Sequence, residues 1–414
     1  MDLRRLKLVT LFTVCFFLYV VGVVLRLRQL FFMCGATGLL PLLAWLLTRL
    51  SLRAIRVRRL LPERLFEGEE ACVALEVVNI SRWPRWMVGV EDGLPAGIEV
   101  VEGHRSRDFF PILWPGEKRI LRYAIVPSLR GLYRWRDVLL VGVDPLGLFR
   151  VEKRFPWEGE VVVYPRPWEG MTMSALGYSA RSGGMERSPR LLPDGIEFHS
   201  TREYQPGDDL RRIHWKSTAR TGKLTVIDFE GGELPQRWLV LDLQRGTHRG
   251  QGREASLEYA VKWAATVARE SLQRGSAVGF WAQGRSLWEV PLHSHAEQWI
   301  RLLEVLAQVQ ADGEIPLARL LERNLALFRP AGALTLFTAH PDSALAEAIE
   351  RCVAEKIWVE CFFFPPETFE GKGIHLPSRR FIARLAALGI PVHCIPQGQP
   401  QGLRWEASHA SARV

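Results

Sequence analysis

Two long apolar runs open the chain. Leu8 to Leu25 contains no charged residue, and neither does Leu30 to Leu47. A helix that rises 1.5 Å per residue needs about 20 residues to cross about 30 Å of hydrocarbon, so each run is close to the required length. The pattern predicts a transmembrane helical hairpin over residues 1–52, with helices at about 8–25 and 30–47. A cleaved signal peptide is the alternative for the first run, but no small-x-small cleavage site follows it.

Short apolar runs with a period of two come next, between about residues 60 and 167. Cys72 to Val78 and Arg119 to Ile125 alternate in this way, and the second follows a turn at Pro115-Gly116-Glu117. Strands of this length separated by Gly, Pro and Asn are typical of antiparallel sandwiches. We therefore expect an immunoglobulin-like β-sandwich over residues 53–167.

Strands and helices alternate in the last part of the chain. The predicted strands are Trp238 to Leu243, Ala277 to Trp281, Ala333 to Phe337, Ile357 to Phe364 and Val392 to Ile395. The predicted helices are Glu254 to Arg274, Ala296 to Gln308, Leu317 to Phe328, Asp342 to Glu355 and Pro377 to Leu388. This order favours an α/β domain over 237–396 with a doubly wound parallel sheet, followed by a polar tail over 397–414.

Residues 168–236 join these two regions, and residues 195–230 within them carry the densest polar signal. Residues 168–194 show no sustained periodicity, which is typical of a linker, although a lid is the alternative. Two apolar-alternating runs, Ile196 to Tyr204 and Leu224 to Phe229, then flank a Pro206-Gly207 turn and a short basic segment. The pattern predicts a strand, a tight turn, a short helix and a second strand.

The net charge of +9 is confined to the start of the chain. Residues 1–60 hold ten Lys or Arg and one acid, whereas the other residues hold 44 basic and 44 acidic side chains. A general nucleic-acid binder would carry its excess on the folded domains, so we predict no nucleic-acid partner. Basic residues flank both outer ends of the hairpin, and only Arg26 and Arg28 lie in its turn. The positive-inside rule then predicts a protein integral to the cytoplasmic membrane, with the bulk of the chain facing the cytoplasm.

The six cysteines do not form a recognisable framework. They occur at positions 15, 34, 72, 352, 361 and 394, with no CxxC pair and no regular spacing. This distribution predicts neither a disulfide scaffold nor a zinc site, and it favours free thiols in a reducing compartment.

Several stretches together resemble the signature of the bacterial domain-of-unknown-function family 58. Two upstream pieces are Arg130 to Tyr133 and Asp144 to Phe149, with Val163-Tyr164-Pro165 after them. The signature and candidate docking residues are Glu197, Arg202, Tyr204, Pro206, Gly207, Asp208, Arg211, His214, Trp215 and Arg220. The resemblance implies a C-terminal domain similar to von Willebrand factor A domains. It also implies an association with MoxR-type AAA+ ATPases, which are proposed to help mature or assemble other complexes.

A von Willebrand A domain holds its metal ion through an Asp-x-Ser-x-Ser motif, a Thr and a second Asp, because Mg²⁺ requires hard oxygen ligands. Here the corresponding positions are Asp242, Gln244 and Gly246, so the hydroxyls are missing. The loop from Asp312 to Leu317 lacks the Thr, and the strand that should lead to the second Asp gives Phe337 to His340. We therefore predict a degenerate site that holds no metal, and no cofactor elsewhere.

The central stretch admits three interpretations. Asp208 or Asp209 with His214 could serve a ligand-binding or hydrolytic domain, but offsets of five and six do not bring side chains onto one helix face. A structural network of arginines and carboxylates is the second interpretation, because the arginine fork suits bidentate pairing. The third is that spare guanidinium groups form a docking surface for an acidic partner. We favour a membrane-anchored, non-enzymatic adaptor or assembly factor working with a MoxR-type ATPase. The hydrolytic or ligand-binding domain is the alternative.

Overall fold

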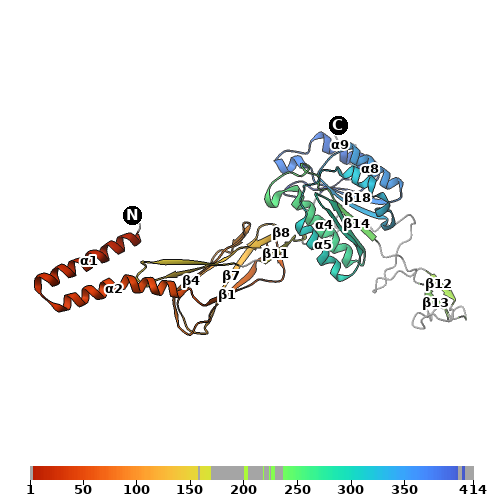
Figure 1. Ribbon diagram of the computed structural model, residues 1–414. Helices are drawn as coiled ribbons and strands as arrows, with labels where there is room; N and C mark the ends of the chain where they lie inside the picture. The colour runs from red at the N-terminus through yellow and green to blue at the C-terminus, as the bar shows by residue number, and fades with distance from the viewer. Residues whose placement is uncertain are drawn as a thin grey trace. The chain divides into compact units, whose positions relative to one another are not determined.

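The computed structural model divides into two compact units, residues 1–166 and 167–414 (Figure 1). The structure describes residues 3–156, 159–168, 200–203, 218, 223, 225–228, 236–399 and 403–405. Each unit has its own apolar core and is treated by itself.

The first unit begins with the two predicted helices, α1 (Leu3–Leu25) and α2 (Arg28–Ser51). They pack against each other, with Cys15 Sγ 3.3 Å from Cys34 Sγ. Their outer surface is apolar and open: Phe12, Phe16 and Phe32 are 68%, 69% and 80% exposed. A core helix of a soluble domain would bury such side chains. Both helices are long and apolar enough to cross a membrane.

Two antiparallel sheets follow and enclose a common core. One has the order β1-β3-β7-β5 and the other β10-β9-β4-β6. Their strands are β1 (Ile55–Leu60), β3 (Ala71–Asn79), β4 (Arg85–Asp92), β5 (Ile98–Val100), β6 (Arg107–Leu113), β7 (Lys118–Pro127), β9 (Val138–Val143) and β10 (Arg150–Phe155). A smaller sheet contains β2 (Leu65–Phe66), β11 (Gly159–Tyr164) and β8 (Gly131–Trp135). The predicted alternation is clear in β3, where Val73, Leu75 and Val77 are fully buried.

The end of α2 is built into this sandwich. Leu52 directly follows the helix and lies in the sandwich core together with Ile55. Gly142 on β9 makes room for the helix end, since a Cβ there would lie 2.3 Å from Ser51 Oγ. Helix and sandwich therefore share one core at this point, and α2 cannot move independently of the sheets.

A buried polar network crosses the sandwich. The Arg59 and Asp92 side chains are both fully buried and form an ion pair, with Arg59 Nε 3.1 Å from Asp92 Oδ2. Tyr123 donates its hydroxyl to the same carboxylate, and Arg59 Nη2 donates to the carbonyl of Arg136 at 3.0 Å. Burial, together with the Asp92 charge, raises the pKa of Tyr123 far above its ordinary value, so the phenol stays protonated.

The second unit is built on a seven-stranded sheet with the order β16-β15-β14-β17-β18-β19-β20. Its strands are β14 (Gln236–Leu241), β15 (Ala277–Gln283), β16 (Leu287–His293), β17 (Ala333–Thr338), β18 (Trp358–Phe363), β19 (Val392–Cys394) and β20 (Leu403–Trp405). The five central strands are parallel, but β16 and β20 pair antiparallel at the two edges. The sheet is therefore mixed: the five predicted strands are parallel, and the two antiparallel edge strands were not predicted. Within the predicted polar tail, residues 403–405 form the edge strand β20.

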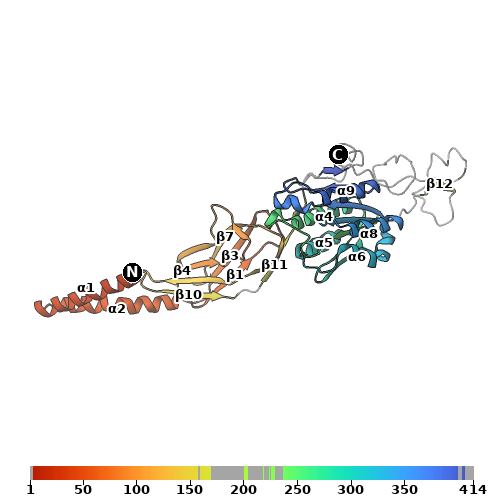
Figure 2. The ribbon, with the colours of Figure 1, turned by 90° about the horizontal axis from the view of Figure 1, so that it is seen from above.

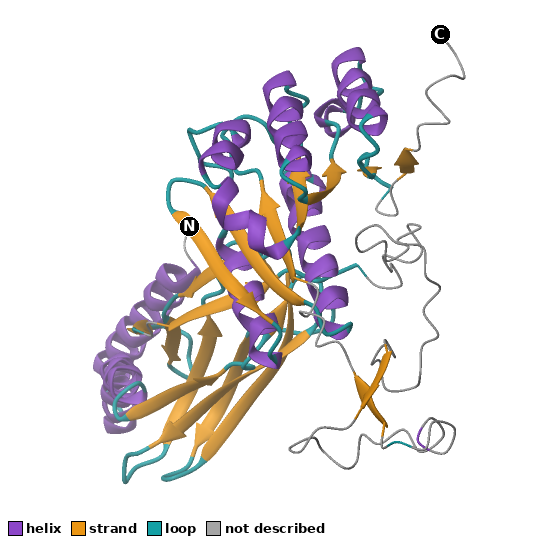
Figure 3. Ribbon diagram, turned by 90° about the vertical axis from the view of Figure 1, so that its right-hand side faces the viewer, coloured by secondary structure: helices purple, strands orange, loops and turns teal. Residues whose placement is uncertain are grey.

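Helices cover both faces of this sheet (Figures 2 and 3). They are α4 (Ser256–Gln273), α5 (Ala296–Gln308), α6 (Leu317–Arg323), α7 (Leu325–Phe328), α8 (Ser343–Ala354) and α9 (Leu376–Ala387). Residues of α6, α8 and α9 share a core with Val240 and Cys361. On the other face, the ring of Trp263 in α4 lies 5.1 Å from that of Phe362. The single helix predicted over 317–328 is interrupted at Asn324, so that prediction was wrong in its length.

The strand order creates a switch point in the sheet. β14 comes first in the sequence and lies between β15 and β17, so the chain winds in opposite directions from it. In open α/β sheets the crevice outside the carboxyl ends of two such strands is the preferred place for a binding site. The loops that follow β14 and β17 are therefore the first place to look for function.

Part of the central stretch is also described. β12 (Ser200–Glu203) and β13 (Thr225–Asp228) pair antiparallel, with Arg202 opposite Val226. Both fall within the two strands expected on either side of the Pro206-Gly207 turn.

Candidate functional site

Asp242 follows β14 directly and fixes the switch point. Its side chain is buried, Oδ2 accepts a hydrogen bond from Thr338 Oγ1 at 2.8 Å, and Oδ1 accepts one from the Gln244 amide at 3.1 Å. Thr338 is the last residue of β17, so the carboxylate holds the ends of the two strands together. Both of its oxygens are committed to hydrogen bonds within the chain.

The surroundings of Asp242 do not fit the metal site of a von Willebrand A domain. Gln244 offers an amide and Gly246 no side chain where hydroxyls would be needed. The loop that would supply a Thr instead pairs through its backbone: Gly313 N donates to Leu243 O at 2.9 Å, and Arg245 N donates to Gly313 O at 2.8 Å. Among the described residues no group of three or more His, Cys, Asp or Glu is placed to hold a metal ion. The absence of a metal remains a prediction.

Gly313 allows this close approach of the two loops. A Cβ at this position would lie 2.7 Å from the carbonyl oxygen of Gln283 and 3.0 Å from that of Leu243. Gly313→Ala must therefore move backbone, and we expect it to lower the free energy of unfolding of this unit by about 1–3 kcal/mol. Urea unfolding would measure the loss. Gly373→Ala is the matched control, because nothing lies within 4 Å of its Cβ position. Equal stability of the two variants would contradict the prediction.

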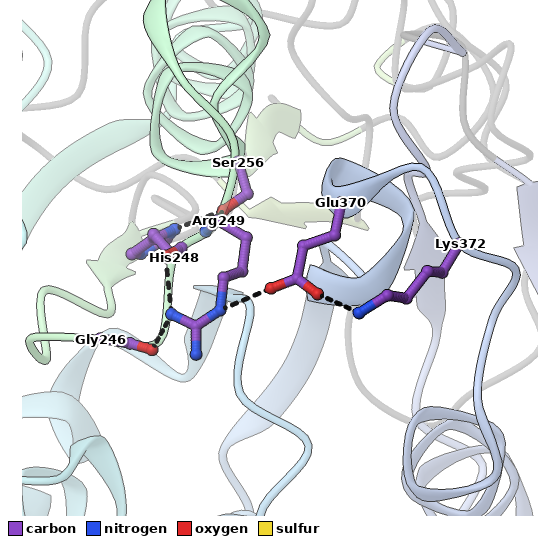
Figure 4. Close-up of polar contacts among 6 residues, drawn as sticks. All are labelled: Gly246, His248, Arg249, Ser256, Glu370 and Lys372. Carbon is purple, nitrogen blue, oxygen red and sulfur yellow. Dashed lines mark hydrogen bonds and ion pairs between the residues drawn. The ribbon is translucent and has the colours of Figure 1, made fainter.

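His248 and Ser256 form a pair at the start of α4 (Figure 4). His248 Nε2 lies 2.8 Å from the carbonyl oxygen of Asp242, which can only accept, so Nε2 carries the proton. In the neutral ring Nδ1 is then the acceptor for the Ser256 hydroxyl, 3.1 Å away. A nucleophilic serine must reach its substrate. Ser256 is fully buried and its Oγ also accepts from the Arg249 amide at 3.0 Å, so the pair fixes the loop and does not present a nucleophile.

A charged cluster connects the loop after β14 with the segment after β18. Arg249 Nε lies 3.1 Å from Glu370 Oε1, and Lys372 Nζ lies 2.8 Å from Glu370 Oε2 (Figure 4). Arg249 also donates to the carbonyl of Gly246. The hydrogen bond and charge of Lys372, with a contribution from Arg249, hold the pKa of Glu370 below its ordinary value. Glu370 is therefore ionised at neutral pH.

Several basic side chains are exposed at this end of the sheet. Arg249 and Lys372 are 44% and 57% exposed along their side chains, and Arg245 on the same loop is exposed. Glu370 is shared between the first two. We call Arg245, Arg249, Glu370 and Lys372 the basic rim.

The structure brings some of the predicted residues together. Asp242, Gln244 and Gly246 lie in one loop at the switch point, and Arg202 lies on β12. The remaining predicted residues lie outside the described part of the chain: Glu197, Tyr204, Pro206, Gly207, Asp208, Asp209, Arg211, His214, Trp215 and Arg220.

The pair of His248 and Ser256 and the basic rim were not predicted. Position relative to the predicted strands could have indicated them, because carboxyl ends of parallel strands meet at one edge of a sheet. Residues 242–256 follow one such strand and 364–376 another.

Part of the chain that contains this site matches a known protein family. Residues 200–350 match the family described as "Protein of unknown function DUF58". The matched range contains β12, β13, β14 and the loop of Asp242, His248 and Arg249. The chain is 24% identical over 288 residues to the uncharacterized protein YeaD of Bacillus subtilis, covering 69% of this chain and 70% of that protein.

Other similarities are more local. The uncharacterized protein Rv1480 of Mycobacterium tuberculosis is 30% identical over 126 residues, and the match spans 29% of this chain and 40% of that protein. Among solved structures, the CARDB domain of PF1109 from Pyrococcus furiosus is similar to part of this chain, at 14% identity and a TM-score of 0.18. The alignment covers 27% of this chain and 94% of the CARDB chain. The two relatives carry names that assign no activity.

Proposed function

We propose that this chain is a membrane-anchored, non-enzymatic adaptor or assembly factor of domain-of-unknown-function family 58. In this proposal it presents its α/β unit in the cytoplasm to a MoxR-type AAA+ ATPase. One observation carries the proposal: at the switch point the carboxylate, hydroxyl and imidazole groups are committed to one another. The basic rim is exposed beside these groups.

The chemistry of the basic rim suits an acidic protein surface. Exposed charges that complement a partner steer association and fix register, and arginine can bind a carboxylate through two hydrogen bonds. Arg249 already pairs with Glu370, so a partner carboxylate would share or replace that contact. The signature arginines Arg202, Arg211 and Arg220 are further candidates for the same partner.

The anchor and the fold are parts of the proposal. Two open apolar helices support the hairpin, and the basic residues at its outer ends support the cytoplasmic orientation. The order β16-β15-β14-β17-β18-β19, with an antiparallel edge strand, supports a doubly wound domain similar to von Willebrand A domains.

A pull-down from detergent-solubilised membranes tests the docking role. We expect an AAA+ ATPase to co-purify with the full chain and to be reduced at least tenfold by Arg249→Glu, because charge reversal opposes an acidic partner. Arg351→Glu is the control: Arg351 is 64% exposed and pairs with Glu322, at the α6 and α8 side of the same unit. Arg211→Glu tests the signature stretch in the same experiment.

Two results would contradict the proposal. Equal recovery of the ATPase with Arg249→Glu, Arg211→Glu and the parent chain would exclude both surfaces as docking sites. A hydrolytic turnover that His214→Ala abolishes, without any stable partner, would favour the enzyme instead.

A further inference from the structure

Two exposed tryptophans lie in neighbouring turns of the sandwich. Trp83 is 73% exposed and Trp114 is 59% exposed. Trp83 lies between β3 and β4, and Trp114 lies between β6 and β7. Tryptophan is normally well buried, so two such rings exposed in one region indicate a contact surface.

Hydrogen bonds hold both turns beside the end of α2. Asn79 is fully buried and its Nδ2 donates to the carbonyls of Trp83 and Leu113, each at 2.9 Å. The Gly116 amide donates to the Asn79 carbonyl at 2.8 Å, which fixes the second turn. The Ile80 amide donates to the carbonyl of Ala54 at 3.0 Å, and Ala54 lies three positions beyond the last residue of α2. The tryptophans are therefore fixed at the sandwich end that receives the hairpin.

The outer ends of the hairpin helices indicate where the membrane surface lies relative to this end of the sandwich. Arg49 in the last turn of α2 lies over the ring of Trp45, 4.7 Å from its centroid. In α1, Lys7 Nζ donates to the carbonyl of Leu146 at 3.0 Å, which brings the turn after β9 to the other outer end of the hairpin. Trp, Lys and Arg at the ends of apolar helices are typical of the interface between hydrocarbon and water.

Guanidinium groups without acidic partners lie in the same place. Arg53 follows α2, and Arg85 opens β4 beside the Trp83 turn. Within the described part of the chain no carboxylate forms an ion pair with either residue, and Arg85 Nε is buried without a hydrogen-bond partner. Burial, and the neighbouring charge of Arg53, lower the pKa of Arg85 from its ordinary value. Two close, like charges with no counter-charge favour the binding of an anion.

We propose that this end of the sandwich binds the phosphate headgroups of anionic phospholipids in the bilayer that the hairpin crosses. The interfacial patch consists of Arg53, Trp83, Arg85 and Trp114, together with Arg82, which is exposed next to Trp83. Its tryptophan rings lie at headgroup level, where an amphipathic ring is favoured, and its guanidinium groups bind phosphate oxygens. The inference rests on the proposed membrane anchor and goes beyond it, because it places one end of the folded sandwich against the lipid headgroups.

Measurements of the depth of labelled residues in the bilayer test whether this end of the sandwich contacts the headgroups. The full chain, carrying Cys72→Ser, would be labelled with a fluorophore at Trp83→Cys or Trp114→Cys in vesicles of phosphatidylcholine with about one third phosphatidylglycerol. We expect quenching by lipids with a headgroup nitroxide at both positions. Leu132→Cys is the control, because Leu132 is 43% exposed on β8, at the other end of the sandwich (Figure 1). Phe16→Cys in α1 reports the anchor through quenching by an acyl-chain nitroxide.

The labelled positions distinguish failure of the interfacial patch from failure of the membrane anchor. If Phe16→Cys is quenched and the two tryptophan positions are no more quenched than Leu132→Cys, the interfacial patch is wrong while the anchor stands. If Phe16→Cys is not quenched, the anchor itself fails.

Lipid titration of the detergent-solubilised full chain, followed by native mass spectrometry, tests whether the arginines of the interfacial patch select anionic lipids. We expect phosphatidylglycerol to bind at least tenfold more tightly than phosphatidylcholine. The double variant Arg53→Gln/Arg85→Gln should remove that preference. Arg134→Gln is the control, since its side chain is 81% exposed on β8. Equal binding of both lipids would overturn the proposal. So would complete displacement of the lipid by millimolar inorganic phosphate, which would make the site one for free anions.

Discussion

Asp92→Ala should destabilise the sandwich by about 3–5 kcal/mol, because it leaves a buried guanidinium without its counter-charge. The Arg59 side chain is fully buried and donates hydrogen bonds to Asp92 and to the carbonyl of Arg136. The same substitution removes the acceptor of the Tyr123 hydroxyl. Hydrogen exchange followed by mass spectrometry on the detergent-solubilised full chain would measure the effect. Amides of β4 and β7 should lose protection, whereas those of β14 and β17 in the other unit should keep theirs.

An exposed ion pair of the same sandwich provides the control. Arg134 and Glu160 are 81% and 50% exposed along their side chains. Glu160→Ala should cost no more than about 1 kcal/mol, since solvent screens such pairs. If the Asp92 variant lost no more protection than this control, water would have to reach Arg59 in the folded state.

Local patterns were sufficient to find most elements of the fold. The period of two in β3 and the helical spacing of α4 and α5 each describe one buried face, which needs no knowledge of neighbouring elements. β16 was missed because it contains Pro291 and is largely exposed along an edge, so its sequence lacks the continuous apolar run of a central strand. β20 is three residues long and follows a polar stretch. Its pairing with β19 is decided by the sheet, not by local propensity.

The candidate site was only partly predictable for a related reason. Asp242 stands at the end of an obvious strand, but its hydrogen bond with Thr338 depends on the pairing of β14 with β17. The contact of Arg249 with Glu370 depends on two loops separated by more than a hundred residues. Strand order decides whether such loops meet, and a single sequence carries no direct record of that order. The same holds for the interfacial patch, because Ile80 and Ala54 come together only once β1 and β3 have paired.

The largest effect in the α/β unit is expected for Glu360→Gln. Glu360 on β18 lies between two side-chain partners: Arg237 Nη1 is 2.9 Å from Oε2, and His393 Nε2 is 2.8 Å from Oε1. Arg237 also donates to Thr335 Oγ1 at 2.7 Å, and all four residues are buried. The substitution keeps the shape but removes the charge that offsets Arg237. We expect a loss of about 3–5 kcal/mol in the free energy of unfolding of this unit.

The pH dependence of this unit provides an independent measurement. Burial raises the pKa of Glu360, but the hydrogen bond from His393 and the charge of Arg237 outweigh burial, and the net pKa lies below its ordinary value. A lowered carboxyl pKa means stability that is present above about pH 4.3, the unfolded value, and is lost as the pH falls through the folded value. The parent chain should therefore lose protection of β14, β17 and β18 amides in acid, and Glu360→Gln should lack that component. Glu322→Gln, in the exposed pair with Arg351, should follow the parent curve. An unchanged acid dependence in Glu360→Gln would show that another carboxylate controls it.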